Sequence, residues 1–178
     1  SKRVQEKCGF TYHHTIKDIP CPLMGDIRTE HMTCLPKDNW IVETRKLGNH
    51  EINDALSLVW DVFMQFEAPE YSQEGIDEFR GTRDDSERIG RMKFYGAIEN
   101  NRIVGVLAMR SPQHISFFFV KADHHQRGIG NKLIMTMKKD YELKEFTVNS
   151  SPYAVEIYKH LGFIPTDKEQ LTNGIRYT

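Results

Sequence analysis

The order of apolar and polar residues predicts alternating strands and helices from Ile41 onward. Residues Ile41–Leu47 alternate with the period of two that is typical of a half-buried strand. Apolar residues then recur at the spacing of a helix with one buried face, and Asn49 stands where a capping residue is favoured. The apolar positions of this expected helix are Ile52, Leu56, Val59, Trp60 and Phe63.

A second helix is expected after a break at Ala68-Pro69-Glu70. Ser72 can cap this helix, because a serine side chain accepts hydrogen bonds from the N–H groups of a first helical turn. Ile76 and Phe79 are its apolar positions. The stretch 81–90 is polar, and we interpret it as a loop.

Three strands are predicted in the middle of the chain. The first two, Lys93–Glu99 and Arg102–Arg110, are joined by Asn100-Asn101, and asparagine tolerates the positive φ that a tight hairpin turn requires. The third strand is Ile115–Val120. Together they indicate consecutive hairpins.

The later part of the chain predicts strand–helix units. Gly128 is expected to open a helix, and residues 145–148 to form a short strand. Ser151-Pro152 is typical of a helix start, and Gly162 of a left-handed residue just past a helix end. The apolar positions of the first of these helices are Ile129, Leu133, Ile134 and Met137.

Two closing strands are expected at Phe163–Pro165 and Ile175–Tyr177. Hairpins come first and strand–helix units later, so the sheet should be mixed. The pattern therefore predicts an α/β (α+β) domain over residues 41–178, with a central mixed, mostly antiparallel β-sheet flanked by helices.

Composition narrows the classes of function. The chain has 178 residues, enough for one domain with a core, and its net charge of −1 gives no general attraction for nucleic acid or a membrane surface. The longest apolar run, Ile115–Val120, is too short to span a bilayer. Three cysteines and a charged start that is unlike a signal peptide favour a cytoplasmic protein with reduced thiols.

The segment 120–132 carries the clearest chemical signal, because it joins an apolar strand to an amphipathic helix through a turn with Gly128 and Gly130. Glycines allow close approach to a ligand, and a helix start presents free N–H groups and partial positive charge to a pyrophosphate. A Walker loop is absent, and a dinucleotide fingerprint would need glycine at Leu133. An ordinary strand–helix loop remains the alternative for the two glycines alone. Local positive charge comes from Lys121, Arg127 and Lys132.

Two segments resemble the GNAT superfamily of acetyl-CoA-dependent N-acetyltransferases. Residues 125–130, His-Gln-Arg-Gly-Ile-Gly, are similar to its motif Q/R-x-x-G-x-G/A, with His125 where Gln or Arg is usual. Residues 148–163 resemble its later signature N-x-x-A-x-x-x-Y-x-x-x-G-F, with Ser151 at the usual Asn position. The resemblance implies a GNAT fold over residues 41–178, acetyl-CoA as co-substrate, and pairing of the strand end with the pantetheine arm. The implied cofactor-binding residues are Phe118, Phe119, Val120, His125, Gln126, Arg127, Gly128, Ile129, Gly130, Asn131, Asn149 and Ser151.

Acetyl transfer needs a proton donor for the leaving thiolate and a way to deprotonate the amine. The resemblance gives the donor role to Tyr158, since tyrosine has a pKa of about 10 and stays protonated at neutral pH. The alternative is a core tyrosine on an amphipathic helix. The candidate bases are Glu67, Glu70 and His114, each of which could instead be structural, and a water-mediated path is also open. Period-two spacing places His114, Ser116, Phe118 and Val120 on one face of their strand.

Residues 1–40 form a separate segment that resembles the C-terminal tail of ribosomal-protein-alanine N-acetyltransferases. The resemblance implies a helix end followed by two strands, in a partial domain without its own cofactor loop. Such strands cannot bury themselves alone, so we expect them to pack on residues 41–178 or on a second chain. The histidines and cysteines of the segment lack the paired spacing of a zinc site, so no metal is expected.

Two functions remain at this point. The first is an N-acetyltransferase that acts on the primary amine of a small molecule or a peptide, without nucleic acid or membrane partners, and that could form a homodimer. The second is a non-catalytic module that binds acyl-CoA and regulates a partner. Tyr158 favours the enzyme, whereas His125 and the absence of a carboxylate on the strand Ile115–Val120 keep the second function open.

Overall fold

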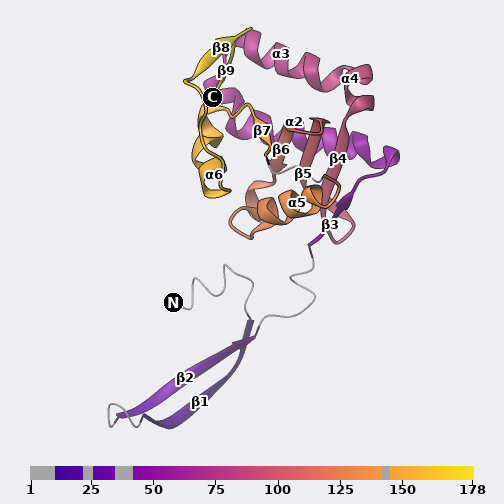
Figure 1. Cartoon of the computed structure of the whole chain (residues 1–178). Helices are drawn as coiled ribbons and strands as arrows, with labels where there is room; N and C mark the ends of the chain where they lie inside the picture. The colour runs from indigo at the N-terminus through magenta and orange to yellow at the C-terminus, as the bar shows by residue number, and fades with distance from the viewer. Residues whose placement is uncertain (1–10, 22–25, 35–41, 142–144) are drawn as a thin grey trace. The chain divides into compact units, whose positions relative to one another are not determined.

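The computed structural model describes residues 11–21, 26–34, 42–141 and 145–178. The chain divides into two units, Ser1–Ile41 and Val42–Thr178 (Figure 1). In the first unit, strands β1 (Thr11–Cys21) and β2 (Asp26–Cys34) form an antiparallel hairpin. The helix end expected around residues 3–10 lies outside the described residues, and the origin of this unit in a second acetyltransferase domain stays a prediction.

The second unit is built on a five-stranded sheet of order β3-β4-β5-β6-β7. Neighbouring strands are antiparallel up to β6, and β7 lies parallel to β6, which confirms a mixed, mostly antiparallel sheet. The strands are β3 (Glu43–Lys46), β4 (Lys93–Glu99), β5 (Arg102–Ser111), β6 (His114–Val120) and β7 (Thr147–Val148). Asn100 and Asn101 have φ values of 50° and 59°, as the predicted hairpin turn requires.

Helices cover both faces of this sheet (Figure 1). One core cluster joins α2 and α3 to one face, and a second joins α5 to the other. The helices are α2 (Ile52–Phe66), α3 (Gln73–Asp84), α4 (Ser86–Arg91), α5 (Ile129–Lys138) and α6 (Val155–His160). No helix in the described part of the chain is long and apolar enough to cross a membrane.

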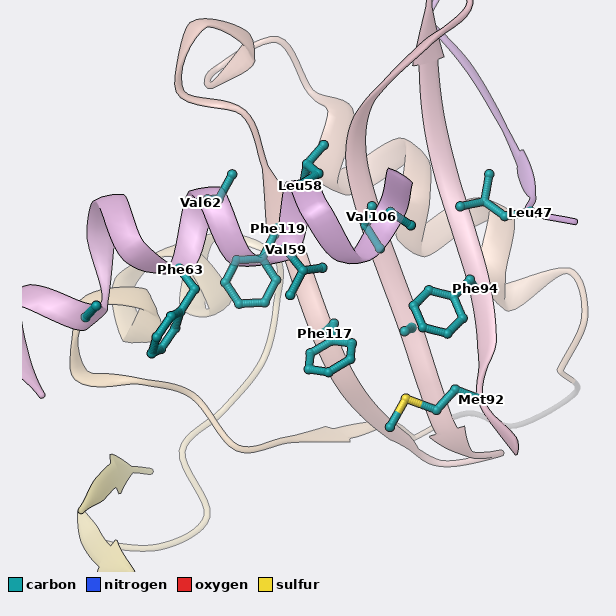
Figure 2. Close-up of a cluster of buried hydrophobic side chains, with 13 residues drawn as sticks. Leu47, Leu58, Val59, Val62, Phe63, Met92, Phe94, Val106, Phe117 and Phe119 are labelled. Carbon is teal, nitrogen blue, oxygen red and sulfur yellow. The ribbon is translucent and has the colours of Figure 1, made fainter. Parts of the chain in front are cut away.

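The core on the α2 side shows why the helix forms where it does (Figure 2). Val59 and Phe63, two of the predicted positions, are fully buried, but Ile52, Leu56 and Trp60 are only partly buried. The most buried face of α2 is displaced from the predicted one, so that it meets the aromatic side chains of β6. Its residues are Ala55, Leu58, Val59, Val62 and Phe63.

A β-bulge changes the faces of β6. Met109 pairs with Ile115 and Ala108 with Phe117, so Ser116 is an extra residue in the ladder. Ile115 consequently lies in the same core cluster as Phe118 and Val120, on the α5 side. The expectation that His114, Ser116, Phe118 and Val120 share one face is therefore wrong, because one unpaired residue shifts the alternation.

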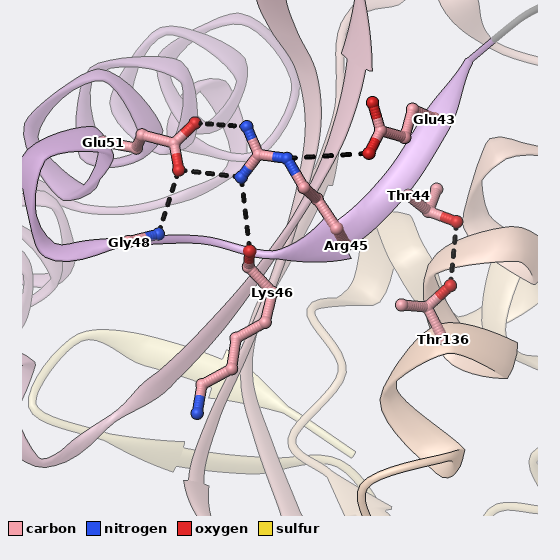
Figure 3. A network of polar contacts seen from close by, with 7 residues as sticks. All are labelled: Glu43, Thr44, Arg45, Lys46, Gly48, Glu51 and Thr136. Carbon is pink, nitrogen blue, oxygen red and sulfur yellow. Dashed lines mark hydrogen bonds and ion pairs between the residues drawn. The ribbon is translucent and has the colours of Figure 1, made fainter.

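The start of the first helix also differs from the prediction. Asn49 does not cap it but begins a 3₁₀ turn, Asn49–Glu51, whose capping residue is Gly48. Glu51 accepts the Gly48 N–H at 2.9 Å and both terminal nitrogens of Arg45 at 2.8 Å (Figure 3). These bonds lower the pKa of Glu51 to about 2, with the Arg45 hydrogen bond as the main cause. Glu51, within the turn, thus accepts the Gly48 N–H in place of the expected Asn49 cap, and Arg45 of β3 holds its carboxylate.

The polar stretch 81–90 is helical rather than a loop. The predicted Ser72 cap is confirmed, since its Oγ accepts the Gly75 N–H at 3.3 Å, and α3 continues to Asp84. The Asp85 side chain accepts the Arg88 N–H at 3.0 Å and starts α4. An exposed helix needs caps and helix-favouring residues rather than an apolar stripe, which is why periodicity missed it.

The closing hairpin differs from the expected strands. Residues 163–165 form no strand, whereas β8 (Gln170–Thr172) pairs with β9 (Ile175–Tyr177). Asn173-Gly174, with φ values of 50° and 75°, forms the turn between them, and this dipeptide is the sequence signal that could have found β8. The turn packs on the start of α3, where a Cβ on Gly75 would lie 2.3 Å from the Gly174 carbonyl oxygen.

Gly75→Ala should lower the free energy of unfolding by about 1–3 kcal/mol, because the new methyl group would meet backbone that cannot move without shifting the hairpin. Gly81→Ala in the same helix is the matched control, since no atom lies within 4 Å of its added Cβ. That variant should be up to about 1 kcal/mol more stable than the wild type. Urea unfolding of both variants measures the difference, and equal stabilities would contradict the close contact.

Candidate functional site

A cavity of about 330 Å³ lies along β6, between α2, α3, α6 and the closing hairpin. It brings together three of the four residues considered for catalysis, from three distant parts of the chain. Glu67 follows α2, His114 begins β6, and Tyr158 lies on α6. Glu70, the remaining candidate base, is exposed and does not line the cavity.

Glu67 has the properties of a tuned acid–base group. Burial raises the pKa of its carboxyl to about 7, with a further rise from the neighbouring Glu70 and a partly offsetting effect of the Ser151 hydroxyl. The carboxyl is therefore close to half ionised at neutral pH. A group poised in this way can both accept and release a proton during turnover.

Ser151 lies beside Glu67 and has an unusual hydroxyl. Its side chain is 7% exposed, and its Oγ makes no hydrogen bond of ordinary length and angle within the described residues. It also does not cap the following helix turn. The hydroxyl still acts on the pKa of Glu67, and a group that binds in this cavity can offer it a hydrogen bond of better geometry.

Tyr158 is buried at 8% exposure between two aromatic rings, with centroids 5.8 Å from Phe118 and 5.3 Å from Phe163. Burial, and then the charge of Glu67, raise the pKa of Tyr158 far above its usual value. The hydroxyl is protonated throughout the physiological range. It is thus a core residue that also lines the cavity and keeps its hydroxyl protonated.

His114 lies where β6 and β7 begin to pair. Its Nδ1 is 2.9 Å from Thr147 Oγ1, which in turn donates its single hydrogen to the Gln113 carbonyl at 3.2 Å. The histidine must therefore donate from Nδ1, which leaves Nε2 as an acceptor. Burial, and then the charge of Arg110, lower the pKa of His114 to about 4, so it is neutral at pH 7.

The turn before α5 has the backbone that was predicted for a phosphate site. Gly128 has φ of 73° with open space around its α-carbon, and Gln126 is also left-handed, with φ of 60°. The first helical hydrogen bond at this end runs from the Lys132 N–H to the Gly128 carbonyl, so earlier N–H groups have no partner in the helix. A Cβ on Gly130 would lie 3.0 Å from Phe118, which places the turn against the cavity wall.

The side chains of the turn bind one another. His125, which departs from the motif, has its Nε2 2.8 Å from the Val120 carbonyl oxygen and closes the turn onto the end of β6. Arg127 is paired with Glu99, whose other oxygen lies 2.8 Å from His124 Nε2. The Arg127 charge is therefore largely neutralised, and backbone N–H groups with the helix dipole are what the turn offers to an anion.

The remaining predicted cofactor residues lie along β6 and after β7. Phe118, Phe119, Asn149 and Ser151 line the cavity, whereas the side chain of Val120 packs in the α5 core. β7 pairs with β6 only at two positions, His114↔Thr147 and Ile115↔Val148. Beyond them the edge of β6 has no strand partner in the described part of the chain. An extended ligand can therefore bind along this edge.

Sequence reasoning missed several residues of the cavity. Tyr71, Phe79, Arg88, Arg110 and Tyr177 line it as well, and the loop prediction for 81–90 concealed the helix that carries Arg88. No sequence signal distinguishes Arg110 from the other surface arginines. The Asn173-Gly174 turn could have indicated a closing hairpin, and this hairpin brings Tyr177 to the cavity.

A sequence profile of the acetyltransferase (GNAT) domain matches residues 67–178. The chain belongs to the GNAT acetyltransferase family. It is accordingly an N-acetyltransferase that uses acetyl-CoA as co-substrate, and the matched residues include the cavity and the glycine turn. None of the curated protein sequences matches the chain.

Solved structures share the GNAT fold at low sequence identity. A GCN5-related N-acetyltransferase from Rhodopseudomonas palustris has a TM-score of 0.64 at 20% identity, over 76% of this chain and 91% of its own. YjaB from Escherichia coli has a TM-score of 0.59 at 19% identity, over 77% and 94%. The PaiA N-acetyltransferase from Thermoplasma acidophilum, solved with coenzyme A, has a TM-score of 0.57 at 20% identity, over 76% and 95%.

The geometry fits this co-substrate in three respects. The turn at Gly128 can offer free backbone N–H groups to a pyrophosphate, the open edge of β6 can accept an extended arm, and the buried Ser151 hydroxyl lines the cavity. These features follow one another along β6, which leads from the cavity to the turn.

Gly128→Val should weaken acetyl-CoA binding tenfold or more, because a β-branched residue disfavours the left-handed backbone and fills the space open to the phosphates. Gly162→Val is the matched control, since Gly162 also has positive φ, 89°, and open surroundings but lies outside the turn. Both variants should lose similar stability. Calorimetric titration with acetyl-CoA distinguishes them, and equal dissociation constants would contradict the assignment of the turn.

Proposed function

We propose that the chain transfers the acetyl group directly from acetyl-CoA to a primary amine, with Glu67 as general base and Tyr158 as general acid. The observation that carries the proposal is the meeting of these two side chains in one cavity, close enough for the charge of Glu67 to affect Tyr158. The bound co-substrate supplies a thioester, which the amine attacks at its carbonyl carbon. The side chains move the protons.

Glu67 is the better base by a clear margin. Proton transfer from an ammonium of pKa about 10.4 to Glu67, with its pKa of about 7, costs about 4–5 kcal/mol. Transfer to His114, with its pKa of about 4, costs about 9 kcal/mol. His114 acts instead through the hydrogen bond that joins the start of β6 to β7.

Tyr158 supports departure of the thiolate. A thiol has a pKa of about 8.5, so a protonated tyrosine next to the sulfur can donate its proton or share it in a hydrogen bond. Burial is the main cause of the raised pKa of Tyr158, and the negative charge of Glu67 raises it further. When Glu67 takes the proton of the amine, that charge disappears and Tyr158 becomes a stronger acid. Deprotonation of the amine and protonation of the sulfur are coupled in this way.

The residues predicted to bind the cofactor divide into two groups under this proposal. Backbone N–H groups of the turn hold the pyrophosphate, through Gln126, Arg127, Gly128, Ile129, Gly130 and Asn131, with His125 as the side chain that closes the turn. The cavity group, Phe118, Phe119, Asn149 and Ser151, holds the acyl arm. The size of the cavity suits a small molecule or one residue of a peptide as acceptor. A cytoplasmic location and a homodimer stay predictions.

Tyr158→Phe should lower kcat by about 10²–10⁴-fold, because the proton donor is lost while the ring contacts are kept. The dissociation constant for acetyl-CoA should stay within about threefold of the wild type, since the cavity keeps its shape. Thiol release from acetyl-CoA in the presence of a panel of primary amines gives kcat, and calorimetry gives the binding constant. A variant as fast as the wild type would remove Tyr158 from the mechanism.

The pH profile tests the base. In the wild type, kcat/KM should fall tenfold per pH unit below about pH 7, because the Glu67 carboxyl is then protonated and cannot accept a proton. Glu67→Gln should be slower at pH 8 and show no break near pH 7, because its rate then follows the free-amine fraction, which rises up to the amine pKa of about 10.4. His114→Asn should keep the limb, since the pKa of His114 is about 4. A break near pH 7 that persists in Glu67→Gln but disappears in His114→Asn would make His114 the base.

A further inference from the structure

Two arginines line one end of the cavity without a carboxylate partner. Arg88 on α4 and Arg110 near the end of β5 are both part of the wall. Neither forms an ion pair with any residue that the structure describes. Most other arginines of the second unit do, namely Arg45, Arg80, Arg83, Arg91, Arg127 and Arg176.

The fold holds these two side chains near each other. The Arg88 guanidinium donates a hydrogen bond to Thr82 Oγ1 at 3.2 Å, and its backbone N–H donates to Asp85 at the start of the helix. Arg110 is the extra residue of a bulge in β5, since Met109 pairs with Ile115 and Ser111 with His114. Burial and the charge of Arg88 lower the pKa of Arg110, as expected for two cations kept in proximity.

Unpaired guanidinium groups on a cavity wall attract an anion. Each presents a planar fork of N–H donors that matches a carboxylate, and an anion between them would relieve their mutual repulsion. We propose that Arg88 and Arg110 form a subsite for a carboxylate of the acceptor, so that the acceptor is an amine that also carries a carboxylate. This proposal rests on the acetyltransferase function and adds the class of its acceptor.

The position of the subsite on β6 indicates where the carboxylate lies in the acceptor. Arg110 is level with His114 and Ile115, whereas Tyr158 packs on Phe118, three to four residues further along the strand. That separation is about 10 Å along the strand. The long side chain of Arg110 can cover part of this distance. The amine and the carboxylate should therefore be several bonds apart, as in the side-chain amine of a diamino acid or in a peptide.

A second groove, formed by α3 and the start of α4, suggests a competing class of acceptor. Its carboxylates come from Glu74, Asp77, Glu78 and Asp85, and they would favour a second positive charge, as in a polyamine. Two of them already have partners: Asp77 pairs with Arg80, and Asp85 caps α4. Arg88 borders this groove too and Glu78 also lines the cavity, but Arg110 lies in the cavity with Glu67 and Tyr158 and not in the groove, so we favour the carboxylate.

Matched acceptors that differ only in the carboxylate test the proposal. With the complete chain and acetyl-CoA, kcat/KM should be at least tenfold higher for L-lysine than for cadaverine, and for L-ornithine than for putrescine. Arg110→Gln should lower kcat/KM for L-lysine ten- to a hundredfold, mainly through KM, with at most a few-fold change for cadaverine. Arg102→Gln, at the opposite end of β5 and outside the cavity, should change neither.

Three outcomes would overturn the proposal. Equal or higher kcat/KM for the diamines would show that the acidic groove selects the acceptor. A loss in Arg110→Gln that is the same for both members of a pair would show a structural role for the arginine. Preference for O-phosphoethanolamine over L-lysine would replace the carboxylate by a phosphate. Failure of the acetyltransferase function itself would be distinct, because the chain would then bind no acetyl-CoA and release no thiol with any amine.

Discussion

The pairing of β6 determines the rest of the site. β5 pairs with this strand along its length, but β7 pairs with it only at His114 and Ile115 before the two separate. The separation leaves the backbone groups of one β6 edge available, and it opens the space that Glu67 and Tyr158 enter from their helices. The hydrogen bond between His114 and Thr147 lies at the point where the strands part.

Packing holds this opening in place from both faces. Phe117 and Phe119 are buried against α2 and α3, and Phe79 approaches both rings within about 6 Å (5.9 and 6.1 Å between centroids). Phe118 points to the other face, where it contacts Tyr158 and lies against the glycine turn. Ordinary alternation makes this division, and the bulge at Ser116 brings Ile115 to the side of Phe118. Core and site therefore share the same strand.

Desolvation gives the cavity its chemistry. Burial raises the pKa of Glu67 and of Tyr158 and lowers that of His114, so in each case the neutral form is favoured. The same burial makes the Glu67 charge act strongly on its neighbours, because little solvent screens it. The turn before α5 follows the opposite principle: it lies at a helix start, where free N–H groups attract negative charge.

Local patterns determined much of this protein. The hairpin at Asn100-Asn101, the buried face of α5 and the glycine turn follow from two- and 3.6-residue periods and from positive-φ preferences, which act over a few residues. The expectation that Tyr158 belongs to the site came from the motif in residues 148–163. The caps at Gly48 and Asp85, the bulge at Ser116 and the packing of Gly75 on Gly174 depend on contacts that periodicity does not record.

Only the tertiary structure decided what the candidate residues have in common. Glu67, His114 and Tyr158 stand far apart in the chain, and their meeting in one cavity is a property of how α2, β6 and α6 pack. The poised carboxyl of Glu67 likewise depends on burial, which no stretch of sequence specifies for an acidic residue after a helix. Arg88 and Arg110 are ordinary surface residues in the sequence, and they become neighbours because a helix and a bulged strand bring two like charges to the same wall.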